Sequence, residues 1–190
     1  MSLTLQTLYN GDTMGDIIFN KTRNVKSPTQ AYNYPAGTDF YIPEYASDFY
    51  VDLVSKNPNK YDYKLDVSPK LDYMTITLMP NGRLLIPSGI RVILDDPNTC
   101  LLAVNKSGIA SKKGVVVGAQ LVDYDYQGEI HINLINTTRD VVQFKTGDKV
   151  IQFMHLPVLY SPFREVCTED FDKLKPDSDR KCNGFGSSGT

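Results

Sequence analysis

The sequence has little of what metal centres and disulfide frameworks are built from. Its 190 residues include three cysteines, two histidines and no tryptophan. Three widely spaced cysteines, an odd number, make neither a disulfide framework nor a zinc-ligand pattern. Two isolated histidines exclude a histidine-rich centre and the HExxH site of metalloproteases. We therefore expect a reduced, cytoplasmic protein without metal ligands of its own.

An excess of basic residues and long apolar runs are also lacking. Lys and Arg number 20 against 22 Asp and Glu, for a net charge of −2, which argues against nucleic acid as the main ligand. No apolar run approaches the roughly 20 residues of a membrane span. The first sixteen residues lack the basic and then apolar pattern of a secretory signal. We expect neither a nucleic-acid nor a membrane partner, and a host-cytoplasmic location if the source is viral.

What is present is the pattern of a β protein. Apolar and polar residues alternate over residues 73–79, 90–95 and 129–136, and residues 149–156 are apolar on nearly both faces. Gly, Pro and Asn turns separate these segments, which is typical of an antiparallel sandwich or jelly-roll barrel. One short helix is predicted from Ser47 to about Lys56, where apolar residues recur at i,i+4 spacing.

The C-terminal part has a different character. The strand pattern fades after Pro157, residues 168–180 are dense in charge, and the end is rich in Gly and Ser. We predict a main domain over residues 1–160 and a flexible, solvated arm over residues 161–190. By composition alone the Gly/Ser end has no role.

Two segments carry residues suited to chemistry. In NKSGIASKKG (105–114), a lysine, a hydroxyl and a glycine could wrap an anionic oxygen, although a plain hairpin loop fits equally. In GAQLVDYDYQGE (118–129), Asp123 ends an apolar run, so its carboxylate could act as a base at a pocket rim. An ordinary acidic hairpin is the alternative there.

The order of the segments carries more information than any one of them. The chain contains AGTDF (36–40), NKSGIASKKG, GAQLVDYDYQGE, then GDKVIQF (147–153) and RKCNGFGSSG (180–189). This series resembles the five ordered motifs of the homotrimeric dUTPases. The resemblance implies an all-β, distorted jelly-roll or β-barrel fold of the β-clip type, and a homotrimer with shared active sites. It implies hydrolysis of dUTP to dUMP and pyrophosphate, with Mg²⁺ held by the triphosphate and water. That reaction limits uracil incorporation into DNA and supplies dUMP for dTTP synthesis.

The resemblance also assigns residues. It makes Asp123 the catalytic residue that orients the attacking water and meets the 3′-hydroxyl, and it lays the Tyr126 ring against the deoxyribose, where a 2′-hydroxyl would collide. Asp39 matches a mainly architectural aspartate. The remaining substrate-binding positions are Lys106, Ser107, Gly108 and Gln152 on the phosphate side, Gln120, Leu121, Val122 and His131 around the uracil, and Arg180, Phe185, Gly186, Ser187 and Ser188 in the tail, which then acts as a lid.

The sequence departs from the family pattern in small ways. Lys106 and Lys149 stand where arginine is usual, and each offers a point charge in place of a bidentate fork. Asn105 replaces the usual proline, and Gln120 and Asn183 replace glycines. Because Asp123 and Tyr126 are intact, we expect activity to be retained.

A larger departure lies between the first two motifs, where residues 41–104 are longer than the family norm. We place the surplus near residues 44–70, which include the predicted helix and several aromatic residues. It is either a surface embellishment or a segment that binds another protein. Since no motif residue lies there, a short linker in its place is expected to preserve catalysis.

Two rival functions stay open. A dCTP deaminase, or an enzyme with both activities, would share the fold. A regulatory binding protein would use the insertion. The stretch DYDYQG and the glycine-rich tail favour the dUTPase.

Overall fold

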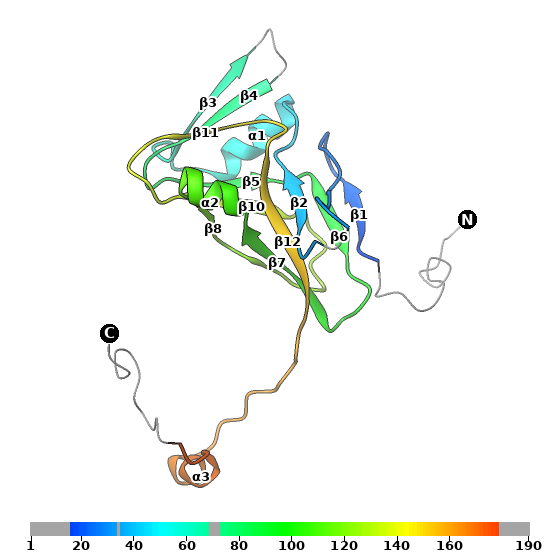
Figure 1. The fold of residues 1–190 in the computed structure, drawn as a ribbon, viewed down its shortest axis with the longest axis vertical. Coiled ribbons are helices and arrows are strands. Elements are labelled where there is room, and N and C mark those ends of the chain that lie inside the picture. The colour runs from blue at the N-terminus through cyan, green and yellow to red at the C-terminus, as the bar shows by residue number, and fades with distance from the viewer. Residues whose placement is uncertain (1–15, 34, 69–72, 179–190) are drawn as a thin grey trace, which may run out of the picture. The chain divides into compact units, whose positions relative to one another are not determined.

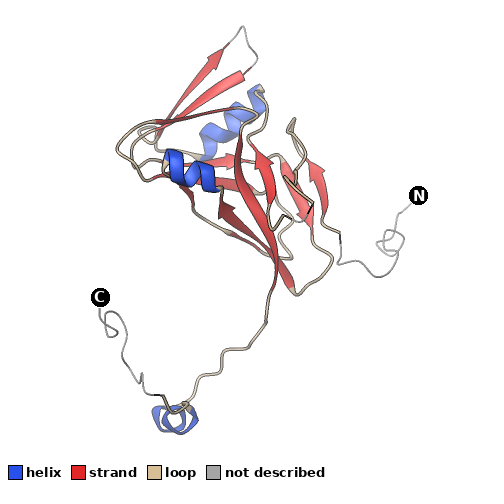
Figure 2. Ribbon diagram, in the orientation of Figure 1, coloured by secondary structure: helices blue, strands red, loops and turns tan. Residues whose placement is uncertain are grey.

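The computed structural model describes residues 16–33, 35–68 and 73–178. It divides into two units, of which the first ends at Leu159 and the second begins at Tyr160. The first unit is mostly β (Figures 1 and 2). Its described strands are β1 (Ile18–Lys21), β2 (Thr38–Tyr41), β3 (Tyr63–Ser68), β4 (Tyr73–Leu78), β5 (Arg83–Pro87), β6 (Ile90–Ile93), β7 (Thr99–Asn105), β8 (Val115–Val117), β9 (Leu121–Val122), β10 (His131–Asn136), β11 (Val142–Lys145) and β12 (Lys149–Pro157).

These strands form antiparallel sheets in the orders β1-β6, β5-β10-β8, β11-β4-β3 and β2-β12-β7-β9. The non-sequential neighbours show that strands distant in the chain pair with one another, as in jelly-roll folds. The all-β, jelly-roll-like prediction is confirmed, although the sheets of the described residues do not close into a barrel. No helix of the described residues is long and apolar enough to cross a membrane.

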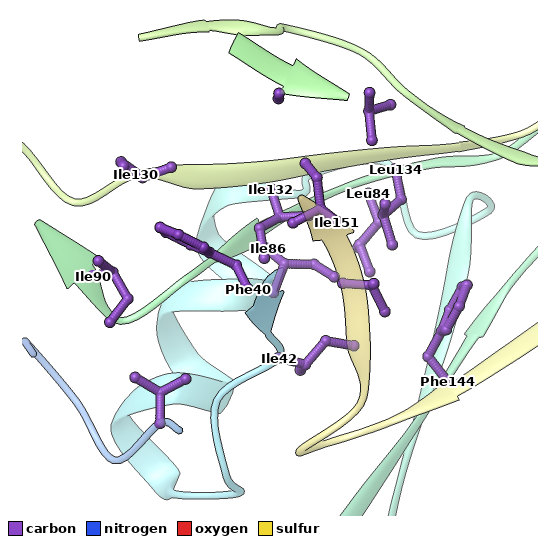
Figure 3. Packing of buried hydrophobic residues seen from close by; sticks show 14 of the residues in the cluster. Phe40, Ile42, Leu84, Ile86, Ile90, Ile130, Ile132, Leu134, Phe144 and Ile151 are labelled. Carbon is purple, nitrogen blue, oxygen red and sulfur yellow. The ribbon is translucent and has the colours of Figure 1, made fainter. Parts of the chain in front are cut away.

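The core follows the alternation seen in the sequence. Met74, Ile76 and Leu78 of β4 are buried, as are Ile132 and Leu134 of β10. Figure 3 shows side chains from β5, β10 and β12 converging in this core. Because residues two apart on a strand face the same side, the period of two in the sequence was enough to predict which residues lie inside.

The long connection between the first two motifs is part of this core. It contains α1 (Ser47–Lys56), whose Phe49 and Leu53 have no exposed surface. The side chain of Asn57, directly after α1, donates to the carbonyl oxygens of Leu53 and Leu85, each at 2.7 Å, and accepts from the Leu85 N–H at 2.8 Å. The helix at 47–56 is thus confirmed. The burial of Phe49 and Leu53 shows that the insertion is more than a surface embellishment, since a short linker in its place would empty part of the core. That such a replacement preserves catalysis stays a prediction.

The prediction of a single helix is wrong. The second described helix, α2 (Ser107–Lys113), stands where a plain hairpin loop was one alternative for residues 105–114, and Gly114 after it is in the left-handed conformation, with φ +61°. The other alternative, a segment that binds an anionic oxygen, stays a prediction. The third helix, α3 (Thr168–Leu174), lies in the second unit and buries none of its side chains. Both are seven residues long and carry almost no apolar stripe, so periodicity could not reveal them.

Candidate active site

Residues from three of the motif segments meet around one buried carboxylate. Asp39 of β2, only 3% exposed, forms ion pairs with Lys106 and with Lys149, the latter at 3.0 Å. Strand β12 places Lys149 there because β12 pairs with β2, and β7 leads into Lys106 on the other side. A buried carboxylate needs such partners. Asp39 therefore holds two ammonium groups together, which is the architectural role expected of it.

The pairing also affects the titration of Lys149. The hydrogen bond to Asp39, followed by the charge of the same carboxylate, raises the pKa of Lys149 above its ordinary value. Its side chain is 39% exposed, so the cation stays accessible from solvent. An anion that approaches this point meets a lysine that is fully protonated at neutral pH.

The remaining phosphate-side residues lie next to these lysines. Gln152 is the register partner of Asp39, and its amide donates to the carbonyl oxygen of Asn105 at 2.9 Å. Ser107 and Gly108 open α2, where the first N–H groups of a helix have no partner within it. No atom lies within 4 Å of where a Gly108 Cβ would stand, so the backbone there is open to a ligand. The structure thus brings Lys106, Ser107, Gly108 and Gln152 together.

The second group of candidate residues lies on the connection between β9 and β10. Asp123 follows Val122 directly and is exposed, so its carboxylate faces solvent and not the core. The Tyr126 hydroxyl donates to the carbonyl oxygen of Glu129 at 2.9 Å. The tyrosine lies against Gly128, where an added Cβ would come within 2.5 Å of the phenolic oxygen. The hydroxyl of the ring is thus tied to the Glu129 carbonyl, within the same connection as Asp123.

The main chain around this hairpin is open. Strand β9 pairs with β7, and β10 pairs with β8 only from Leu134 onward. No main-chain hydrogen bond joins residues 120–123 to residues 129–132, both fully described. Leu121 and Val122 are therefore not hydrogen-bonded to His131, whose strand partner is Pro87 of β5. A flat polar ring that entered between the two stretches could be bound by backbone donors and acceptors.

His131 adds a polar side chain to this hairpin. Its Nδ1 lies 2.8 Å from the carbonyl oxygen of Glu129, and because a carbonyl only accepts, Nδ1 carries the proton. Its Nε2 is buried and has no hydrogen-bond partner among the described protein atoms. Such an atom is expected to find a partner in a ligand or a neighbouring chain. The Gln120 amide donates to the Val117 carbonyl oxygen at 3.4 Å, a weak contact that leaves the side chain adaptable.

Cys100 of β7 lies beneath the hairpin. Burial raises the pKa of its thiol, and the negative charge of Asp123 raises it further. The thiol is therefore neutral and poorly nucleophilic at physiological pH. Cys100 is thus no candidate nucleophile, and its role at this position is structural.

Within one chain the two groups do not meet. Val122 pairs with Leu101, at one part of β7, whereas Lys106 follows the far end of the same strand. Five residues of extended strand correspond to about 17 Å at ~3.3 Å per residue. A water activated by Asp123 must lie within hydrogen-bond reach of the carboxylate. The tail positions Arg180, Phe185, Gly186, Ser187 and Ser188 lie outside the described residues.

The described part of the chain has no cluster of side chains suited to bind a metal ion directly. Among the described residues, no three His, Cys, Asp or Glu side chains gather closely enough to hold a metal ion. Asp39, the carboxylate of the phosphate-side group, is engaged by two lysines and is not available as a ligand.

Sequence reasoning missed one pair at this site. Arg23 donates to both carboxylate oxygens of Glu129, at 2.9 and 2.8 Å. Glu129 belongs to the third motif segment, but its side chain was given no role, and Arg23 belongs to no motif. The one signal in the sequence was the carboxylate of Glu129 itself, which at the end of an apolar and acidic segment needs a cation nearby.

Comparison with known proteins places these features in a family. Residues 59–189 match the family model of the dUTPases. The deoxyuridine 5′-triphosphate nucleotidohydrolase of Stutzerimonas stutzeri is 34% identical over 156 residues, which cover 81% of this chain and 91% of that protein.

Solved structures share the fold at lower identity. The dUTPase of Staphylococcus bacteriophage 80alpha with dUpNHpp superimposes with a TM-score of 0.65 at 17% identity, over 92% of this chain and 99% of that one. The D95N dUTPase of phage phi11 of S. aureus, described with a coordinated structural Mg(II) ion, gives a TM-score of 0.59 at 17% identity, over 80% and 97% of the two chains.

Proposed function

The chain belongs to the dUTPase family and hydrolyses dUTP to dUMP and pyrophosphate, and we propose that Asp123 is the base of this reaction in a site shared between protomers. The carrying observation is the β9–β10 connection, which holds an exposed carboxylate and a hydrogen-bonded tyrosine and whose two sides are not hydrogen-bonded to each other. We propose that the uracil lies between those edges, around Gln120, Leu121, Val122 and His131.

The chemistry follows from the positions of these groups. Asp123 accepts a proton from a water molecule as the oxygen of that water forms a bond to the α-phosphorus. The bond between the α-phosphorus and the bridging oxygen breaks, pyrophosphate leaves with that oxygen, and dUMP keeps the α-phosphate. A positioned general base contributes roughly 10²–10⁴ in rate. A cytosine in the same place reverses the donor and acceptor of the base edge and leaves main-chain groups unpaired, which disfavours it.

The deoxyribose is recognised by shape. The Tyr126 hydroxyl donates to the Glu129 carbonyl oxygen, and the ring lies against Gly128. We propose that this ring lies against C2′ of the sugar and leaves no room for a hydroxyl. UTP is thereby excluded without a polar contact.

Lysines bind the triphosphate. Lys106 and Lys149, held by Asp39, supply positive charge, and Ser107, Gly108 and Gln152 supply polar groups beside them. Mg²⁺ bound to the triphosphate would neutralise further charge on the leaving group, and we propose that phosphate oxygens and water hold it. We propose that Arg180, Phe185, Gly186, Ser187 and Ser188 close over the nucleotide.

The location we propose is cytoplasmic, in keeping with three widely spaced cysteines.

The separation of the two groups along β7 supports a homotrimer in which one protomer supplies Asp123 and another supplies Lys106. A complementation experiment tests this. An Asp123→Asn chain and a Lys106→Ala chain, each inactive alone, are co-expressed so that mixed trimers form. Shared sites restore about a quarter of the wild-type activity, because that fraction of sites takes an intact contribution from each chain. Sites complete within one protomer would restore none.

Substrate choice is tested by proton release with dUTP, dCTP, dTTP and UTP. We expect dUTP to be turned over far faster than the other three nucleotides. Ammonia release from dCTP would instead show deaminase activity, which no observation on this chain favours.

The proposed homotrimer is tested by light scattering, which should give three times 21.3 kDa.

A further inference from the structure

Three segments far apart in the chain meet at one guanidinium. Arg23 lies between β1 and β2, Asp52 in α1, and Glu129 just before β10. The Arg23 Nη2 group donates to Asp52 at 2.6 Å and to Glu129 at 2.8 Å, and its Nε group donates to Glu129 at 2.9 Å. The Arg23 and Glu129 side chains are 12% and 14% exposed, so water does little to screen this fork.

Glu129 is fixed on a further side. The N–H of Gly89 donates to Oε1 of Glu129 at 2.5 Å. Gly89 has φ +75°, and a Cβ there would lie 2.8 Å from both Arg23 and Val25, so the loop closes tightly around the arginine. The Glu129 carboxylate therefore has three N–H donors, two from Arg23 and one from the Gly89 backbone.

The backbone carbonyl oxygen of Glu129 accepts hydrogen bonds from two residues of the candidate site. It accepts the Tyr126 hydroxyl at 2.9 Å and the Nδ1 proton of His131 at 2.8 Å. The side chain of Glu129 thus faces Arg23, while its carbonyl oxygen orients two residues of the nucleoside-side hairpin. A change at Arg23 would reach Tyr126 through one residue.

We propose that Arg23 is a positioning residue for sugar discrimination: by clamping Glu129 it fixes the carbonyl that holds Tyr126, and Asp52 ties this clamp to the helix of the insertion. This inference rests on the proposed placement of Tyr126 against the deoxyribose. It gives the insertion a link to the substrate site through Asp52, although no motif residue lies in the insertion.

The interaction with Glu129 requires the two parallel N–H donors of a guanidinium, and a positive charge alone is not enough. A lysine at position 23 would keep one positive charge but could not donate in parallel to two carboxylate oxygens. Asp52 contacts only the Nη2 group of Arg23, which also donates to Glu129. Loss of the Asp52 carboxylate should therefore weaken the hold on Glu129 less than loss of the arginine.

The experiment measures kcat/KM for dUTP and for UTP on the same preparation. The ratio of the two values does not depend on the fraction of folded enzyme, so a purely structural defect does not change it. We expect Arg23→Gln to lower the ratio about tenfold, since small displacements at a site have effects of this size or larger. Arg23→Lys should lower the ratio less than Arg23→Gln but should not reach the wild-type ratio. Asp52→Asn should lower the ratio two- to threefold. Asp48→Asn, an exposed acid on the same helix, is the matched control and should leave the ratio unchanged.

Each outcome has one meaning. If wild-type protein does not hydrolyse dUTP, the proposed function fails. If it does, and Tyr126→Ala lowers the ratio while Arg23→Lys and Asp52→Asn keep it within twofold, the positioning role of Arg23 is overturned. Should Arg23→Gln fail to fold, Arg23→Lys and Asp52→Asn still decide the question.

Discussion

Tyr126 and Gly128 are in direct contact, since a Cβ on residue 128 would stand 2.5 Å from the phenolic oxygen and 2.7 Å from Cζ of the ring. Gly128→Ala must therefore displace the ring or the loop. We expect kcat/KM for dUTP to fall by about 10², with little change in thermal unfolding because the loop is at the surface. Gly108→Ala is the control for stability, as its Cβ would meet nothing within 4 Å. Unchanged kinetics in Gly128→Ala would mean that the ring position is not used.

Asp123→Asn keeps the shape of the side chain and removes the base. We expect kcat to fall by at least ~10², with KM for dUTP nearly unchanged, since the triphosphate is bound elsewhere. Steady-state kinetics over a range of dUTP concentrations measures both constants. Asp125→Asn, two residues away in the same exposed loop, should be close to wild type. Near-normal turnover of Asp123→Asn would remove this residue from the mechanism.

Phe49→Ala removes a side chain with no exposed surface from α1. Large-to-small changes of this kind cost about 3–5 kcal/mol, so the free energy of unfolding should fall by that amount in urea titrations. Tyr50→Ala, on the same helix with its side chain partly exposed, should cost much less. Equal and small losses in the two variants would restore the view of the insertion as a surface embellishment.

Lys149 gives a pH-dependent contribution to stability. Its pKa is raised in the folded protein by Asp39, so its contribution is fully present below the unfolded value of about 10.4 and is lost as pH rises through the folded pKa. The difference in unfolding free energy between wild type and Lys149→Met should be constant from pH 7 to 9 and shrink above about pH 10.4. Lys64→Met, at an exposed position of β3, should show no such trend. A difference that stays constant to pH 11 would contradict the pairing.

Truncation after Lys173 removes every tail residue assigned to the lid. If the tail closes over the nucleotide, kcat/KM should fall by roughly 10² or more, while the protein keeps its oligomeric state and the unfolding transition of its main domain. Phe185→Ala should lose less, since Arg180 and the serines remain. Full activity in the truncated protein would return the tail to the role of a disordered end that its composition suggests.

The sequence predicted the strands well because alternation reports directly on burial. Ile90, Val92 and Leu94 are all inside, as the period of two required. It also named both lysines that meet Asp39, through the motifs in which they lie. It could not show that they meet there, because that depends on the pairing of β12 with both β2 and β7.

Other features had no local signal. Arg23 is separated from Glu129 by more than a hundred residues, and nothing in the neighbouring sequence marks either as a partner. The burial of α1 was missed for a related reason. Its apolar residues predicted a helix with one apolar face, but the sequence does not say which sheet that face covers.

Asn57 has a consequence beyond its contribution to packing. Strand β5 is the outer member of its sheet, and at Leu85 its free N–H and C=O are both taken by the Asn57 carboxamide. A side-chain amide here completes the ladder in the way that another strand would. Exposed strand edges are the places where folded chains join into aggregates. The insertion therefore closes, at this point, an edge to which a strand from another molecule could otherwise add.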